Sequence, residues 1–143
     1  MGRYPYLRAY MAGSVAPTAF LLVILTGFTT GRHVWDVPIP LERVIVFPMA
    51  VVPNVWGLWN MLHLWLRSRR HLPLGLHGAV LPFLLAPAGF LITRAVGFTI
   101  PAFAIEALPF VFPVAVVIYY LVWKHLVGFF NELLGIAGKE ALP

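Results

Sequence analysis

Residues 10–30 read YMAGSVAPTAFLLVILTGFTT, a stretch without a single charged side chain. Its length, about 20 residues, is what an α-helix needs to cross the hydrocarbon core of a bilayer. Three further apolar blocks of similar length follow, each ended by a basic residue: 44–66, 74–93 and 102–123. Strands of a membrane barrel are half as long and alternate polar with apolar residues, which these blocks do not. The sequence therefore predicts an all-α integral membrane protein with four transmembrane helices.

The composition of the whole chain favours the same class. Of the 143 residues, 61% are hydrophobic and 10% are charged, whereas about 25% of the residues of a soluble domain are charged. A disordered chain and a soluble enzyme with a charged surface are therefore excluded. The chain has no cysteine, which excludes disulfides and thiol redox chemistry. It also contains no set of nucleophile, base and orienting group and no glycine-rich phosphate loop, so we predict a protein that is not an enzyme.

Basic residues set the expected orientation of the four helices. Seven of them fall on one side of the predicted membrane, namely Arg3, Arg8, Arg67, Arg69, Arg70, Lys124 and Lys139, against Arg32, Arg43 and Arg94 on the other. The positive-inside rule then places both termini in the cytoplasm and the chain in the cytoplasmic (inner) membrane. The net charge of +5 is explained by this bias. Membrane lipids are therefore expected partners, and nucleic acid is not.

Two short motifs recur 65 positions apart. Residues 13–17 (GSVAP) align with 78–82 (GAVLP), and residues 47–52 (FPMAVV) align with 112–117 (FPVAVV). We interpret them as an internal repeat of two tandem hairpins, about 10–66 and 75–131, that run in the same direction as in parallel-repeat transporters. Chance convergence of proline-containing apolar helices remains the alternative.

The most informative polar residues lie in the block 44–66. Trp56, Asn60 and His63 follow one another at i, i+4 and i+7, and Arg67 continues the line, so all four share one helix face. An amide and an imidazole that faced lipid would be costly, so we expect this face to point into protein or into a wet cavity. Two interpretations stay open. The face either holds helices together by hydrogen bonds, or it lines a polar vestibule open to the cytoplasm.

These observations lead to one functional prediction and two alternatives. We predict a four-helix bundle that binds or transports a lipid-like or small amphiphilic ligand, with Trp56, Asn60, His63 and Arg67 as the ligand-binding candidates, and that self-associates or binds a partner membrane protein. No cofactor or metal is expected in this case. The first alternative is an electron-transfer subunit that binds quinone or haem b, the haem lying between His63 and His77. The second is a purely structural subunit of a membrane complex.

The segment 128–143 mixes apolar with polar residues and is too polar to cross the membrane again. We predict an amphipathic helix over this segment, lying on the cytoplasmic membrane surface, with a bend allowed at Gly128. A straight continuation of the fourth membrane helix is the alternative.

Overall fold

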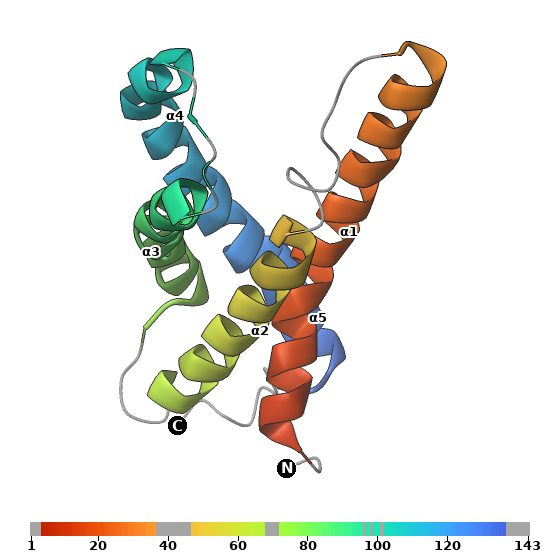
Figure 1. Ribbon diagram of the computed structural model, residues 1–143. Coiled ribbons are helices and arrows are strands. Elements are labelled where there is room, and N and C mark those ends of the chain that lie inside the picture. Colours follow the sequence, from red (N-terminus) through yellow and green to blue (C-terminus); the bar gives the residue numbers. More distant parts are fainter. Residues whose placement is uncertain are drawn as a thin grey trace. The chain divides into compact units, whose positions relative to one another are not determined.

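The computed structural model describes residues 4–36, 47–67, 72–95, 97, 99–100 and 102–136. Within these residues the chain is helical and contains no strand. Figure 1 shows the elements in order: α1 (Pro5–Val34), α2 (Phe47–Arg67), α3 (Leu74–Ala95), α4 (Ala102–Leu121), the π-helical turn η2 (Val122–Val127) and the short helix α5 (Gly128–Leu133). The predicted all-helical class is confirmed.

Three helical stretches of the described chain are long and apolar enough to cross a membrane. They are α1, α3 and the run Ala102–Leu133, which joins α4, η2 and α5. They contain the first, third and fourth predicted blocks, so the membrane class is confirmed by length and composition. The remaining helix, α2, has 21 residues and is not among these stretches. It contains the polar residues Asn54, Asn60 and His63.

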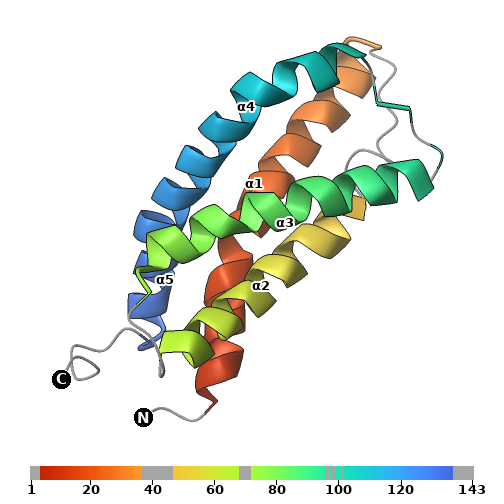
Figure 2. The ribbon, with the colours of Figure 1, turned by 90° about the vertical axis from the view of Figure 1, so that its left-hand side faces the viewer.

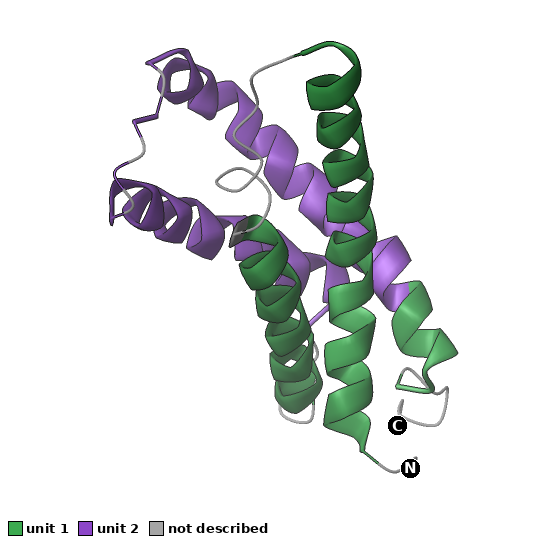
Figure 3. Cartoon of the chain, turned by 45° about the vertical axis from the view of Figure 1, so that its right-hand side comes forward, with its two compact units in different colours: residues 1–70, 129–143 green, residues 71–128 purple. Residues whose placement is uncertain are grey.

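The chain divides into two compact units, each built on a pair of neighbouring helices. The helices α1 and α2 run in opposite directions (Figure 1), and so do α3 and α4 (Figure 2). The first unit contains residues 1–70 and 129–143, so the end of the chain joins the first helix pair (Figure 3). The second unit contains residues 71–128.

Two glycines bring α1 and α2 into close contact in the first unit. A Cβ atom on Gly13 would lie 2.6 Å from the carbonyl oxygen of Trp56 and 2.8 Å from Cβ of Asn60. A Cβ atom on Gly57 would lie 2.6 Å from the ring of Tyr10. The buried residues that surround this crossing on α1 are also small: Ala9, Ala12 and Ala16. Small residues of this kind let helix backbones approach closely in a membrane.

The second unit also has a glycine at the point of closest approach. A Cβ atom on Gly78 of α3 would lie only 2.0 Å from Cγ of Trp123, whose side chain is fully buried. The ring of His77 packs edge-on against the same indole, with the ring centroids 5.9 Å apart. Farther along the pair, the rings of Phe83 and Phe112 pack edge to face at 4.9 Å. Aromatic contacts of this geometry stabilise the pair beyond the area they bury.

The outer surfaces of the helices suit a hydrocarbon environment. No residue of α4 is buried, although nearly all of its side chains are apolar. The exposed or half-exposed hydroxyls of Thr18, Thr26 and Thr93 donate to carbonyl oxygens four residues earlier, at 2.7, 2.8 and 2.6 Å. A hydroxyl bonded to its own helix leaves little polar capacity unsatisfied in lipid.

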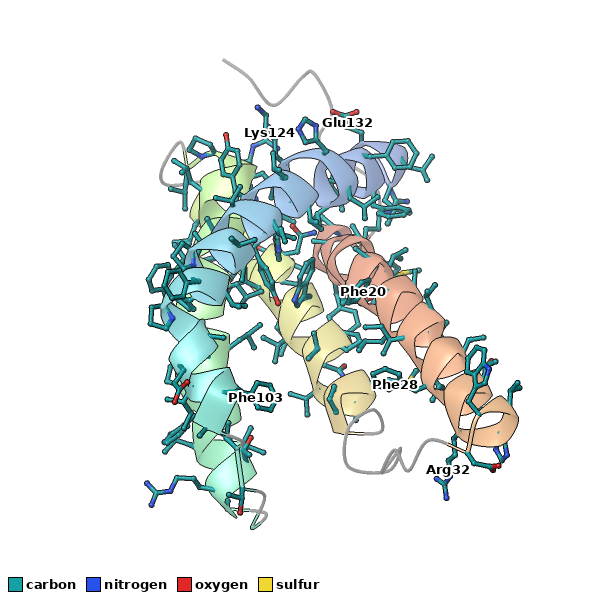
Figure 4. All side chains as sticks on the ribbon, turned by 90° about the horizontal axis from the view of Figure 1, so that it is seen from above. Phe20, Phe28, Arg32, Phe103, Lys124 and Glu132 are labelled. Carbon is teal, nitrogen blue, oxygen red and sulfur yellow. The ribbon has the colours of Figure 1, made fainter. Side chains whose placement is uncertain are left out.

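Charged side chains lie toward the ends of the helical runs. Figure 4 shows Arg32 near the end of α1, and Lys124 and Glu132 on the last turns of the run that ends with α5; all three are exposed. Arg94 lies in the last turn of α3, with its guanidinium 5.8 Å from the centroid of the Phe90 ring. The central turns of the described helices are thus free of formal charge, which would be costly in the bilayer interior.

The last described turn closes with a glycine cap. Gly135 has a φ of 69°. Its N–H donates to the Glu132 carbonyl at 3.0 Å, and the N–H of Ile136 donates to the Asn131 carbonyl at 2.8 Å. This pair of bonds is a Schellman motif, in which the left-handed residue is usually glycine.

The structure describes only residues 128–136 of the segment 128–143, over which an amphipathic helix is predicted. Gly128 keeps a right-handed helical backbone, so the chain does not bend there. The helix ends at Leu133, and residues 137–143 lie outside the described residues. The Arg8 guanidinium donates to the Leu134 carbonyl at 3.3 Å, where a cation is favoured by the negative end of the helix.

Candidate functional site

The candidate site centres on Asn60, the most deeply buried member of the predicted polar face. Its side chain is 1% exposed, and its Nδ2 donates to the Ala9 carbonyl at 2.7 Å and to Oδ1 of Asn131 at 2.8 Å. In return, Nδ2 of Asn131, which is 5% exposed, donates to Oδ1 of Asn60 at 3.3 Å. We call these two residues the amide pair. It joins α1, α2 and α5 inside the first unit.

The other three predicted residues lie on the same face of α2, on both sides of Asn60. Trp56 and His63 are buried, and neither is without an interaction partner. Arg67 is half-exposed and is the last residue of the helix. The face therefore runs from a half-exposed cation at the helix end to a buried indole about three turns farther in. Its three members before Arg67 are buried in the protein.

The amide pair gives Asn60 a structural role that sequence periodicity does not reveal. Both Nδ2 protons are used by protein acceptors, so Asn60 holds α1 and α5 against α2. Its Oδ1, in contrast, accepts one long bond. A carbonyl oxygen has two lone pairs, and N–H···O bonds cluster at about 2.9–3.0 Å. Chemically, Asn60 can therefore still accept a hydrogen bond from a hydroxyl or amine.

A second polar contact crosses the same helix pair outside the predicted face. The Tyr10 hydroxyl donates to Oδ1 of Asn54, and Nδ2 of Asn54 donates to the Ala50 carbonyl at 2.6 Å. Asn54 is exposed and Tyr10 is half-buried. Neither was singled out in the sequence, because Asn54 lies two residues from Trp56 and so off the i, i+4 line.

The two histidines considered as haem ligands belong to different units. His63 lies in the first unit, and His77 is buried against Trp123 in the second. Among the described residues, no three side chains of His, Cys, Asp or Glu are grouped so that they could hold a metal ion. The structure therefore neither supports nor opposes the prediction that His63 and His77 bind haem.

No protein-family model, curated protein or solved structure matches this chain. We therefore infer its function from the contacts of the described residues.

Proposed function

We propose that this chain is a non-enzymatic multi-pass membrane protein that binds or transports a lipid-like or small amphiphilic ligand. The ligand's polar group meets the α2 face of Trp56, Asn60, His63 and Arg67. The observation that carries the proposal is the long 3.3 Å bond from Asn131 to Oδ1 of Asn60, which leaves a buried carbonyl oxygen with acceptor capacity. A hydroxyl or amine of the ligand would donate a second hydrogen bond to this oxygen.

The residues beside Asn60 suit the two ends of an amphiphile. Arg67 offers a cation at the helix end, where a polar or anionic head group would lie. Asn60 precedes it by seven positions, or about 10 Å of helix. The aromatic surface of Trp56 lies deeper still and suits an apolar body. The line of side chains thus changes from charged to polar to aromatic with depth.

The proposal includes α2 as the fourth membrane crossing. Its antiparallel contact with α1 places Asn60 beside Ala9 and Gly57 beside Tyr10. The amide nitrogen of Asn60 is then bonded to protein acceptors, which is the condition for polar groups in a membrane helix. The bond from Arg8 to the Leu134 carbonyl also brings the end of α5 to the start of α1. An even number of crossings returns the chain to its starting side.

The same proposal retains the tandem repeat and the cytoplasmic placement of both termini. The buried positions of α1 and α3 support the repeat, because four of them correspond at the 65-residue offset: Ala12 with His77, Gly13 with Gly78, Ala16 with Leu81, and Pro17 with Pro82. The residue equivalent to the start of α4 is 37, which lies outside the described residues. Orientation follows from the basic residues, by the positive-inside rule.

Two variants of the amide pair separate a ligand role from a purely structural one. Asn60→Leu and Asn131→Leu break the same two bonds between the partners, but only Asn131→Leu leaves the amide of Asn60 in place. We expect native mass spectrometry of the gently released protein to show a small lipid or amphiphile on the wild type and on Asn131→Leu, and none on Asn60→Leu.

Equal ligand retention by the two variants would contradict the proposal, since the amide pair would then serve packing alone. A stoichiometric mass of haem on the wild type would also contradict it and would favour the histidine alternative. Arg67→Gln serves as a second test, because the half-exposed guanidinium makes no described contact that holds the fold. We expect this variant to keep its stability and to lose part of the bound ligand.

A further inference from the structure

Asn54 is an exposed amide that lies within α2 rather than at its ends. One Nδ2 proton goes to the Ala50 carbonyl, and Oδ1 accepts the Tyr10 hydroxyl. An amide nitrogen carries two protons, and a carbonyl oxygen has two lone pairs. Within the described residues, Asn54 thus keeps one donor and one acceptor position beyond these two bonds.

The depth of Asn54 limits what can satisfy it. The residue precedes Arg67 by 13 positions, which is about 20 Å at 1.5 Å per residue. If α2 crosses the membrane as proposed above, Asn54 lies inside a hydrocarbon core about 30 Å thick, about 10 Å from the boundary opposite Arg67. Water and lipid head groups are absent at that depth. An unsatisfied amide there costs several kcal/mol of desolvation without compensation.

The surroundings of Asn54 on the two helices are apolar. Leu58 lies one turn along α2 on the same side and is 58% exposed. Leu7 and Met11, which flank Tyr10 on α1, are also exposed. Asparagine side chains hydrogen-bond across membrane helices, so an exposed asparagine among apolar side chains favours contact with another helix.

We propose that a second copy of this chain satisfies Asn54. Two α2 helices pair about a two-fold axis along the membrane normal, and Asn54 exchanges hydrogen bonds with the partner subunit's Asn54. Because an amide is both donor and acceptor, it is self-complementary across a two-fold axis. Both copies insert in the same orientation, so equal residues meet at equal depth. The inference rests on the membrane crossing of α2 in the proposed function, and not on the ligand.

The chain has no cysteine, so a single introduced thiol reports this interface without background. In Leu58→Cys the thiol lies one turn from Asn54. We expect an added oxidant to link two such chains in membranes, and Val23→Cys, exposed on α1, to give little linkage. Adding Asn54→Leu to Leu58→Cys removes the polar exchange. We expect dimerisation about tenfold weaker, since an interhelical amide bond is worth about 1–2 kcal/mol in model peptides.

The matched control is Thr26→Leu combined with Leu58→Cys. Thr26 is an exposed polar residue of α1 whose hydroxyl already donates to the Leu22 carbonyl, so its loss leaves dimerisation unchanged. Equal linkage with and without Asn54→Leu would overturn the inference. A monomeric protein in which a bound small molecule, rather than a second chain, forms the hydrogen bonds to Asn54 would also overturn it. Rapid reaction of Leu58→Cys with a water-soluble maleimide would instead show that α2 does not cross the membrane. Protection from maleimide without linkage would refute the dimer alone.

Discussion

At the scale of single residues, the amide pair is a buried polar contact that joins three helices of the first unit. Asn60 and Asn131 are both almost completely buried, and each donates a hydrogen bond to the other. Removing one partner leaves the other with buried polar atoms that have lost their bonds, which costs more than the net gain from forming them. The pair therefore stabilises the fold mainly because breaking it leaves buried polar atoms without hydrogen bonds. Loss of Asn60 would also leave the Ala9 carbonyl without its hydrogen bond from Asn60.

We predict that Asn60→Leu and Asn131→Leu each lower the free energy of unfolding by about 1–3 kcal/mol. The double variant should lose less than the sum of the two, because no buried amide is then left without its partner. Equilibrium unfolding in mixed micelles with increasing SDS measures all three. Strictly additive losses would show that the two side chains do not act as a pair.

Only half of the amide pair could be predicted from the sequence. Periodicity within one helix assigns Asn60, Trp56 and His63 to a common face, because residues at i, i+4 and i+7 share a side. Periodicity does not identify a partner in another helix. Asn131 lies 71 positions away, in a segment whose mixed composition favoured a surface helix. Its role follows from tertiary contact alone.

At the scale of elements, each helix pair makes its closest contact at a glycine, against which a larger side chain or the backbone of the neighbouring helix packs. In the second unit, Gly78 accommodates the ring of Trp123, and Gly75 lies against the ring of Tyr120. The π-helical turn η2 contains Trp123 and widens the helix at this contact.

We predict that Gly78→Ala destabilises the protein by about 1–3 kcal/mol, because the added methyl overlaps a buried indole that has no free space to move into. Gly89→Ala is the matched control on the same helix, since nothing lies within 4 Å of its added Cβ. We expect the control to be neutral or slightly stabilising, because alanine favours helix over glycine. Thermal unfolding in detergent compares them. Equal losses would mean that Gly78 is not a contact point.

The sequence predicts helix boundaries within a few residues where the apolar block and the helix have the same length. The prediction is less accurate where a helix continues beyond its apolar block. The predicted blocks 44–66 and 74–93 correspond to α2 (Phe47–Arg67) and α3 (Leu74–Ala95). The first predicted block, 10–30, lies inside the longer α1, because polar residues at a membrane edge continue a helix as readily as apolar ones. The π-helical turn has no sequence signal of this kind, since it depends on packing around Trp123.

At the scale of the whole molecule, the central claim is that the chain crosses the membrane four times. Three stretches of the described chain qualify by length and apolar character. Our proposal adds α2, in which the amide of Asn60 is bonded to protein. Three crossings would place the start of α1 and the end of α5 on opposite sides. The bond between Arg8 and the Leu134 carbonyl places them together.

Thiol labelling of intact cells tests this claim directly, because each variant of this cysteine-free chain carries one thiol. The sites are Tyr4→Cys before α1, Leu72→Cys between α2 and α3, and Thr99→Cys between α3 and α4. A membrane-impermeant maleimide should label only Thr99→Cys from outside, and should label the other two only after the membrane is opened. Labelling of Leu72→Cys from the outside, with Tyr4→Cys protected, would show that α2 does not cross and would contradict the account.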